Sequence, residues 1–310
     1  MLCLQTRRLT HRFREGTALA GIDLEVPAGS IYGFLGPNGA GKTTTLRLLL
    51  GLLAPQAGEI LVFGRPLTPA NRPEAMRRIG AMIESPAFYG NLTARENLLL
   101  LQRIHRCPAA RVDEVLALVG LADTQGKRAA RFSLGMKQRL GLAMALLHGP
   151  DLMILDEPTN GLDPGGIVEM RQLLQRLNRE RGITFLVSSH LLAEVEKFAT
   201  HVGILDRGRL LFQGSIADLQ ARRREAGMVR LRTDDDARAE AWLRQAGHAA
   251  RRGEGGLALP MLDDPAVAAA VAGLVGAGIG IHGVASGQDR ADLEDIFMDM
   301  TEGGARREAA

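Results

Sequence analysis

Residues 36 to 44 read GPNGAGKTT, and this glycine-rich run limits the possible folds more than any other stretch of the chain. It matches the pattern G-x-x-x-x-G-K-[ST], in which backbone N–H groups surround phosphate oxygens. The preceding SIYGFLG (30–36) predicts a buried strand, and the following TLRLLLGLL (45–53) predicts a helix whose N-terminus favours an anion. A strand, this loop and a helix in that order predict a binding site for a nucleoside triphosphate.

Two side chains of this run are expected to do more than shape the loop. The Lys42 ammonium would reach the β and γ phosphates of ATP, and the Thr43 hydroxyl would bind Mg²⁺. ATP and Mg²⁺ are therefore the expected cofactors. The residues predicted to bind ATP here are Gly36, Pro37, Asn38, Gly39, Ala40, Gly41, Lys42, Thr43 and Thr44.

A second apolar strand, LMILDE (152–157), ends in two acids. A buried parallel strand presents its carboxyl end to the ligand crevice, so Asp156 is predicted to bind Mg²⁺. Glu157 is predicted to accept a proton from the water that attacks the γ-phosphate. Apolar strands that end in acids are often only structural, and it is the phosphate loop that favours a catalytic role here.

The first two thirds of the chain alternate strand-like and helix-like segments, which is typical of an α/β domain. Between the phosphate loop and the acidic strand the pattern is mostly helical, and it opens with Thr93 and Glu96 spaced as a capping box. We therefore expect an α/β phosphate-loop core over residues 1–220 that carries a helical insert at about 88–150.

The rest of the chain has a different pattern. The run ARRREAG (221–227) is expected to be a solvated linker, and residues 228–310 follow the order β-α-β-β-α-β. That order predicts a small α+β, ferredoxin-like domain. The closing ADLEDIFMDMTEG (291–303) predicts a short amphipathic helix that could pack on either domain.

Composition excludes several classes of protein. A formal net charge of +3 over 310 residues, without a dense basic stripe, does not indicate a nucleic-acid partner. Cys3 and Cys107 stand alone, which indicates neither a disulfide framework nor a zinc site. No signal peptide is expected, and the longest uncharged stretch (266–281) is too short for a spanning helix, so work at a membrane would require another chain.

The run FSLGMKQRLGLAMALLHGPD (132–151) resembles the signature sequence of the ATP-binding subunits of ABC transporters. Ser133 and Gly135 match the serine and second glycine of that signature, whereas Leu134 and Met136 differ from its commonest form. Ser133 can cap a helix whose N-terminus faces an anion, and Gly135 permits close backbone approach. The resemblance implies that Ser133, Gly135 and Met136 act on the nucleotide of a second subunit.

The remaining motifs follow in the order of that family over residues 1 to about 220. The resemblance implies that Asp163, in NGLDP, meets the opposite subunit and that His190, in SSH, contacts the γ-phosphate as a catalytic residue beside Glu157. It also implies that Phe13 stacks on adenine. By themselves, a strand-end histidine and one early aromatic are ordinary structural residues.

The segment IGAMIESPAFY (79–89) departs from most of the family, which has a glutamine where this chain has Glu84. In this respect the chain resembles a branch of the family that exports bacitracin-like and lantibiotic peptides, where a glutamate in this loop is typical. Its carboxylate is expected to bind Mg²⁺ as well as an amide oxygen would. Ala87, Phe88 and Tyr89 are then expected to contact a permease, with a solvated strand end and a locally packed loop as the structural alternatives.

The resemblance implies an ATPase that couples MgATP-driven pairing of two such subunits, most simply identical ones, to a separate membrane permease. The expected cargo is a peptide antibiotic or an amphipathic drug, and the expected location is the cytoplasm, on the inner face of the cell membrane. The alternative is a soluble clamp of the same class acting on DNA or ribosomes. That alternative would need long coiled-coil insertions or a second cassette, which the chain lacks, and no nucleic-acid partner is expected.

Overall fold

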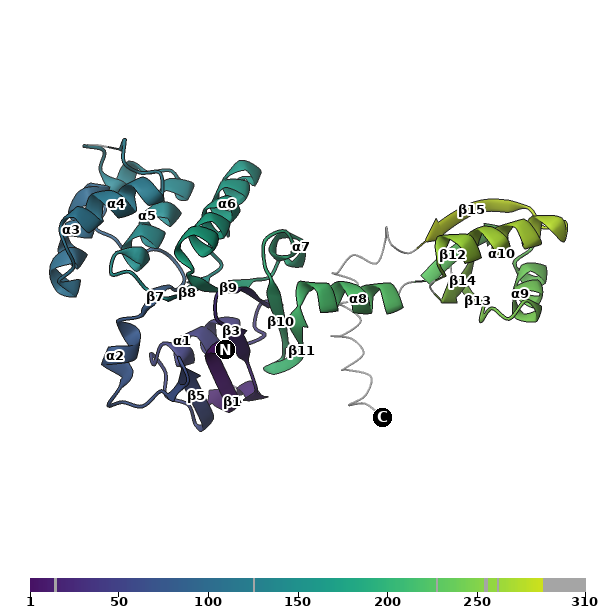
Figure 1. The fold of residues 1–310 in the computed structure, drawn as a ribbon, viewed down its shortest axis with the longest axis horizontal. Coiled ribbons are helices and arrows are strands. Elements are labelled where there is room, and N and C mark those ends of the chain that lie inside the picture. The colour runs from purple at the N-terminus through teal and green to yellow at the C-terminus, as the bar shows by residue number, and fades with distance from the viewer. Residues whose placement is uncertain (14–15, 125, 227, 254–255, 261, 287–310) are drawn as a thin grey trace. The chain divides into compact units, whose positions relative to one another are not determined.

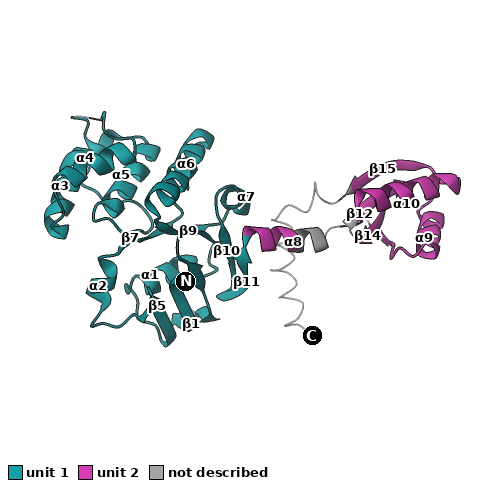
Figure 2. Cartoon of the chain, in the orientation of Figure 1, with its two compact units in different colours: residues 1–215 teal, residues 216–310 magenta. Residues whose placement is uncertain are grey.

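The computed structural model describes residues 1–310 except 14–15, 125, 227, 254–255, 261 and 287–310 (Figure 1). The chain divides into two compact units, residues 1–215 and 216–310 (Figure 2). The predicted closing helix at 291–303 lies outside the described residues.

A six-stranded sheet forms the centre of unit 1. Its strands lie in the order β11 (Arg209–Ser215), β10 (His201–Asp206), β4 (Ile31–Leu35), β9 (Thr184–Ser189), β8 (Leu152–Asp156) and β7 (Ile79–Met82). All neighbours are parallel except β11, which pairs antiparallel with β10. Strands β4, β8 and β9 are buried at every position, which explains why they read as continuous apolar runs rather than alternating ones.

A second, antiparallel sheet covers part of this unit. It contains β1 (Leu2–Phe13), β2 (Gly16–Ile22), β3 (Glu25–Pro27), β5 (Ala57–Val62) and β6 (Arg65–Pro66). Helix α1 (Lys42–Leu49) packs between the two sheets, because Leu46 and Leu49 share one buried cluster with Leu4 of β1 and Ile154 of β8. The helix that follows the phosphate loop is thus fixed from both sides.

The helical insert lies between β7 and β8, as predicted. It contains α3 (Ala94–His105), α4 (Ala110–Leu118), a 3-10 turn (Ala129–Arg131) and α5 (Leu134–Leu146), which group together beyond β7 in Figure 1. The predicted capping box is present, with Thr93 and Glu96 bonding each other's backbone N–H. The other described helices of unit 1 are the short α2 (Arg72–Met76) and α7 (Leu192–Glu196) and the long α6 (Pro164–Arg181), which connects β8 to β9.

Unit 2 begins with α8 (Ile216–Ala226), where the sequence predicted a solvated linker at 221–227. The run IADLQARRREA consists largely of strong helix formers, so the arginines continue a helix instead of breaking it. The boundary therefore falls at residue 215, before the predicted 220.

The predicted β-α-β-β-α-β order follows α8. It comprises β12 (Met228–Thr233), α9 (Asp236–Gln245), β13 (Arg251–Gly253), β14 (Gly256–Pro260), α10 (Asp264–Gly276) and β15 (Ile281–Ser286). The strands lie in the order β13-β14-β12-β15, all antiparallel. Val229 and Leu257 of the sheet share a buried core with Leu243 of α9 and Leu274 of α10. In the described part of both units, no helix is both long and apolar enough to cross a bilayer.

Candidate nucleotide-binding site

The candidate site is built where the parallel strands of unit 1 end. Strand β9 lies between β4 and β8, and the register pairs Leu35 with Ser189 and Ser188 with Asp156. Because parallel strands deliver their carboxyl ends to one edge, the three loops that follow these strands converge there. Residues far apart in the sequence are brought together by this topology alone.

The phosphate loop leaves β4 with a backbone that requires glycine. Gly41 has φ +109°, and a Cβ at that position would lie 2.6 Å from the Ala18 carbonyl oxygen. Within the described part of the chain, no hydrogen bond engages the N–H groups of Asn38, Gly39 or Gly41. Helix α1 then begins without a side-chain cap and without an acid in its first turn. These free donors and the positive end of the helix favour a bound anion.

Lys42 is the cation of this loop, and its side chain is only 6% exposed. Its Nζ donates to the Gly36 carbonyl oxygen at 2.7 Å and to that of Pro37 at 3.3 Å, and lies 3.5 Å from Glu157 Oε1. A buried ammonium is costly without such partners. It is therefore held at the mouth of the loop, with its charge opposite a carboxylate.

Asp156 ends β8 and is 4% exposed. Thr43 Oγ1 donates to its Oδ2 at 2.9 Å, and Ser188 Oγ donates to its Oδ1 at 2.5 Å. The Ser188 hydroxyl also accepts from the Glu157 backbone N–H at 2.9 Å. The predicted Mg²⁺ residues Thr43 and Asp156 are thus in direct contact. Ser188, whose role the sequence did not predict, links the two acids through its single hydroxyl.

Glu157 and His190, the two predicted catalytic residues, also meet. His190 Nδ1 lies 2.9 Å from Glu157 Oε2, and both side chains are partly exposed at the rim of the site. Glu157 has φ +46°, a left-handed conformation uncommon outside glycine, directly after the strand end. The backbone turn places the Asp156 side chain inward and the Glu157 side chain between Lys42 and His190.

The signature residues do not join this cluster in the described part of the chain. Ser133 is exposed and caps α5, its Oγ accepting from the Met136 N–H at 3.3 Å. Gly135 lies in the first turn of that helix, where a Cβ would meet only Leu162 at 3.8 Å. Asp163 is likewise exposed and caps α6, accepting from the Gly166 N–H at 2.9 Å. Each residue has a local role at a helix N-terminus that faces solvent.

Glu84, predicted as an Mg²⁺ ligand, is paired with another group in this structure. It follows β7 with φ +61°, and its carboxylate forms an ion pair with Arg47. No hydrogen bond joins it to Thr43 or Asp156 among the described residues. Arg47 lies one helical turn after Thr43 on α1. Its role as a ligand stays a prediction.

A groove of about 340 Å³ lies beside Glu84, between α3, α5, β7 and the loop that follows β7. Pro86 and Ala87 form part of its wall. A Cβ on Gly141 of α5 would lie 2.7 Å from Pro86 Cβ, so this glycine, missed in the sequence, lets the loop approach the helix. Phe88 is half-buried, whereas Tyr89 is 63% exposed. The Tyr89 backbone is anchored to Asn97 of α3 by two hydrogen bonds.

Phe13 ends β1 and is 47% exposed. Its ring packs edge-on against His11, with centroids 4.8 Å apart. One face is therefore available for stacking, although nothing in the described contacts ties Phe13 to the phosphate loop.

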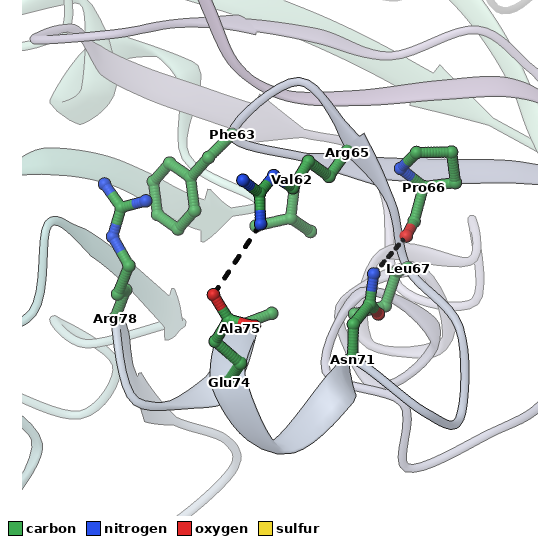
Figure 3. Close-up of a pocket in the computed structure, with 9 residues that line it drawn as sticks. All are labelled: Val62, Phe63, Arg65, Pro66, Leu67, Asn71, Glu74, Ala75 and Arg78. Carbon is green, nitrogen blue, oxygen red and sulfur yellow. Dashed lines mark hydrogen bonds and ion pairs between the residues drawn. The ribbon is translucent and has the colours of Figure 1, made fainter.

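A separate hollow of about 250 Å³ lies between the β5–β6 hairpin and α2 (Figure 3). Arg78 stacks over Phe63 at 3.8 Å and pairs with Asp151, while Arg65 pairs with Glu74. The Asn71 amide donates to the Pro66 carbonyl oxygen. Because its polar side chains already have partners, this hollow gives no indication of a ligand.

A parallel sheet with a phosphate loop after β4, acids after β8 and a helical insert defines a phosphate-loop nucleoside triphosphatase. The model of the ABC transporter family matches residues 19–160. The bacitracin transport ATP-binding protein BcrA of Bacillus licheniformis is 51% identical over 225 residues, which cover 72% of each chain. The chain therefore belongs to the ABC transporter family, as an ATP-binding ATPase.

Further relatives agree with this assignment. The lantibiotic transport ATP-binding protein SrtF of Streptococcus pyogenes is 38% identical over 210 residues, covering 68% of this chain and 90% of its own. The solved structure of cbiO1 from Clostridium perfringens, part of the transporter complex cbiONQ, has a TM-score of 0.67 at 26% identity and covers 79% of this chain and 97% of its own. The dimeric cassette MJ0796, bound to ADP and Pi, has a TM-score of 0.62 at 26% identity and covers 69% of this chain and 98% of its own. None of these comparisons supports the alternative of a DNA or ribosome clamp.

Proposed function

We propose that this protein is the motor subunit of a membrane exporter and that its cargo is a peptide antibiotic or a similar amphipathic drug. The observation that carries the proposal is the 51% identity to a bacitracin transport ATP-binding protein. The contacts of Thr43 with Asp156, and of Glu157 with Lys42 and His190, support it. The 38% identity to a lantibiotic transport protein points to the same class of cargo.

ATP binding rests on the loop from Gly36 to Thr44. The free loop N–H groups and Lys42 would bind the phosphates, and Phe13 would stack on the adenine. Thr43 and Asp156 fit Mg²⁺, because both present hard oxygen atoms, one from the first turn of α1 and the other from the end of β8. Glu84 would join them on leaving Arg47. Bound there, the ion would offset the phosphate charge.

For hydrolysis, Glu157 is proposed as the base and His190 as its positioning partner. A carboxylate that is partly exposed and hydrogen-bonded to an imidazole at 2.9 Å can accept a proton from water while keeping one orientation. The Lys42 ammonium, now 3.5 Å from Glu157, would move its charge onto the phosphates once ATP is bound. This exchange would release Glu157 for the attacking water.

A second copy of the chain is proposed to complete each site. Ser133, Gly135 and Met136 lie at an exposed helix start and can approach a nucleotide held by the opposite copy, and Asp163, at another exposed helix start, can meet that copy. The dimeric relative MJ0796 supports this arrangement. The partner is most simply an identical subunit.

The permease contact is proposed at the loop Ala87 to Tyr89, beside the groove that follows β7. The exposed Tyr89 ring and the apolar wall would receive a cytoplasmic segment of the permease. The protein would then lie in the cytoplasm on the inner face of the cell membrane.

Glu157→Gln tests the motor. The amide cannot accept the proton of water, so hydrolysis should fall by roughly 10²-fold or more while ATP binding is kept. Because unhydrolysed ATP should hold the pair closed, size-exclusion chromatography with MgATP should show a dimer for Glu157→Gln and a monomer for Lys42→Ala. A monomeric Glu157→Gln variant with bound ATP would contradict the paired mechanism.

A mixing experiment tests the composite site. Ser133→Arg should block hydrolysis and leave ATP binding to the isolated subunit within about threefold, because the arginine would obstruct only the opposite nucleotide. Mixing it with Lys42→Ala should restore about one working site per mixed pair. The absence of recovery at every mixing ratio would show that each subunit works alone.

The cargo is tested in cells. Deletion of the gene should increase sensitivity to bacitracin or to a lantibiotic, and the wild-type gene, but not Glu157→Gln, should restore resistance. Glu84→Gln should keep basal ATP hydrolysis within about tenfold while changing permease-stimulated turnover. Unchanged tolerance to peptides and drugs in the deletion strain would contradict the proposed cargo but not the assignment as an ATPase.

A further inference from the structure

The sheet of unit 2 has one face that no described element covers. Val229, Leu231, Leu257 and Leu259 point to the side of α9 and α10, where they form the buried core. Side chains alternate between the two faces of a strand, so residues 230, 232, 258 and 260 point to the other side. Register extends this open face to Arg251 of β13 and to Gly283 and Ala285 of β15.

At the positions whose side chains the structure describes, the open face contains three arginines, one proline and otherwise only glycine and alanine. Arg230, Arg232 and Arg251 are all exposed, and within the described part of the chain no ion pair engages them. On the core side, by contrast, Arg252 pairs with Glu240 of α9 at 2.7 Å. The remaining described positions of the open face are Gly253, Gly256, Ala258, Pro260, Gly283 and Ala285.

The geometry of this face suits a helix that lies roughly along the strands, because Arg230 and Arg232 follow one another on β12. Arg230 and Arg251 lie on either side of Ala258, so their backbones are about 10 Å apart, and the four strands span about 14 Å. The Arg232 guanidinium extends over Gly283, where a Cβ would lie 3.2 Å from its Nε. The floor beside the arginines is therefore low and apolar. The six residues of β12 span about 20 Å along the strand, close to the 21 Å of a helix of about 14 residues.

The chain itself provides a segment of matching chemistry directly after β15. Residues 289–302 contain six carboxylates and one arginine, a net charge of −5. Leu293, Ile296, Phe297 and Met300 recur at helical spacing, which predicts an apolar stripe. Asp292 and Asp299 fall beside that stripe on the same predicted helix. The segment starts three residues after Ser286, on the strand that pairs with β12.

We propose that residues 289–302 dock as a helix on the open face of the unit 2 sheet. The apolar stripe lies on the Gly and Ala floor, and Asp292 and Asp299 pair with Arg230 and Arg232. The short connection gives the segment an effective concentration on the order of millimolar, so even a weak pairing is populated. Single-stranded nucleic acid is a poor occupant, because the described positions of this face contain no aromatic side chain on which a base could stack.

Hydrogen exchange measured by mass spectrometry on the full-length protein tests the docking. Peptides within 289–302 should exchange about tenfold more slowly in the wild type than in Arg230→Glu/Arg232→Glu, because reversed charges repel the segment. Adding Asp292→Arg/Asp299→Arg to that variant should restore the protection. Arg238→Glu/Arg244→Glu on α9 is the matched control, with the same change of charge on the covered side, and should leave exchange of the segment unchanged.

Three results would overturn the proposal. One is exchange of 289–302 at the rate of an unstructured peptide in the wild type. A second is protection that disappears on dilution, which would place the segment on a second copy of the chain. The third is loss of binding to phosphatidylserine vesicles in Arg230→Glu/Arg232→Glu without any change in exchange of the segment, which would assign the arginines to anionic lipid.

Discussion

Units 1 and 2 both pack helices on a sheet, yet they distribute their polar side chains in opposite ways. In unit 1 the parallel strands β4, β9 and β8 end at one edge, where Thr43 and Ser188 donate to Asp156 and Lys42 pairs with Glu157. In unit 2 neighbouring strands run antiparallel, so successive strand ends fall at opposite edges. Its charged residues are spread across a face.

Catalytic groups from several loops can therefore gather in unit 1 but not in unit 2. A parallel sheet gathers several loops at one end, whereas an antiparallel sheet offers a surface. We therefore expect substitutions in unit 1 to change catalysis and substitutions in unit 2 to change stability or docking. The following predictions test that separation.

The largest effect is expected for Lys42→Ala. It removes the buried cation at the phosphates, so the affinity for ATP should fall by roughly 10²-fold or more, measured by titration with a fluorescent ATP analogue. Lys197→Ala, an exposed lysine of the same unit paired with Glu194, is the control and should bind as the wild type does. Equal affinities of the two variants would mean that the phosphate loop is not the binding site.

The next effect concerns the core of unit 2. Leu274 is fully buried, so Leu274→Ala should destabilise this unit by about 2–5 kcal/mol, detected as faster hydrogen exchange in β12 and β14. ATP affinity should remain unchanged. The neighbouring Val275→Ala, at an exposed position, serves as control. If Leu274→Ala also lowered the affinity for ATP, the stability of unit 2 and nucleotide binding by unit 1 would not be independent.

A smaller effect is expected for Ser188→Ala, which removes the hydroxyl shared by Asp156 and the Glu157 N–H. Misplacement of the two acids should reduce the rate of ATP hydrolysis by about tenfold, with ATP affinity within about threefold. Ser189→Ala changes the adjacent serine, whose hydroxyl bonds the Leu191 N–H instead. A wild-type rate in Ser188→Ala would show that Thr43 alone positions Asp156.

The smallest effect concerns pH. Burial, and then the neighbouring His105, lower the pKa of His148 below its ordinary value of 6.5. As pH falls, His148 is therefore protonated at a higher pH in the unfolded chain than in the folded one. The free energy of unfolding of unit 1 should decrease as pH falls from 6.5 through the folded-state pKa. His148→Gln keeps an N–H donor for the Ile79 carbonyl oxygen and should lack this part of the decrease in denaturant titrations. If the free energy of unfolding depended on pH identically in the wild type and in His148→Gln, the decrease could not be assigned to His148.

Most of the fold was predictable, because its signals are local. The buried strands, the capping box at Thr93 and the β-α-β-β-α-β order of unit 2 each follow from a short stretch of sequence. The run at 221–227, expected to be a solvated linker, is helical through residue 226, since helix propensity continues α8 through the arginines. The signals missed in unit 1 are non-local: Ser188 gains its role only beside Asp156, and Gly141 only against Pro86.

The sequence alone determined the identity of the site, because the spacing of GPNGAGKTT and the acids after LMILDE are properties of contiguous residues. The partner of each site side chain, by contrast, depends on how the chain packs. The strand order puts β9 between β4 and β8 and so brings Ser188 to Asp156, and the turn at Glu84 directs its carboxylate to Arg47. The physical reason is that a hydrogen bond or an ion pair needs two groups within about 3–4 Å, and the distance between residues remote in sequence is set by packing.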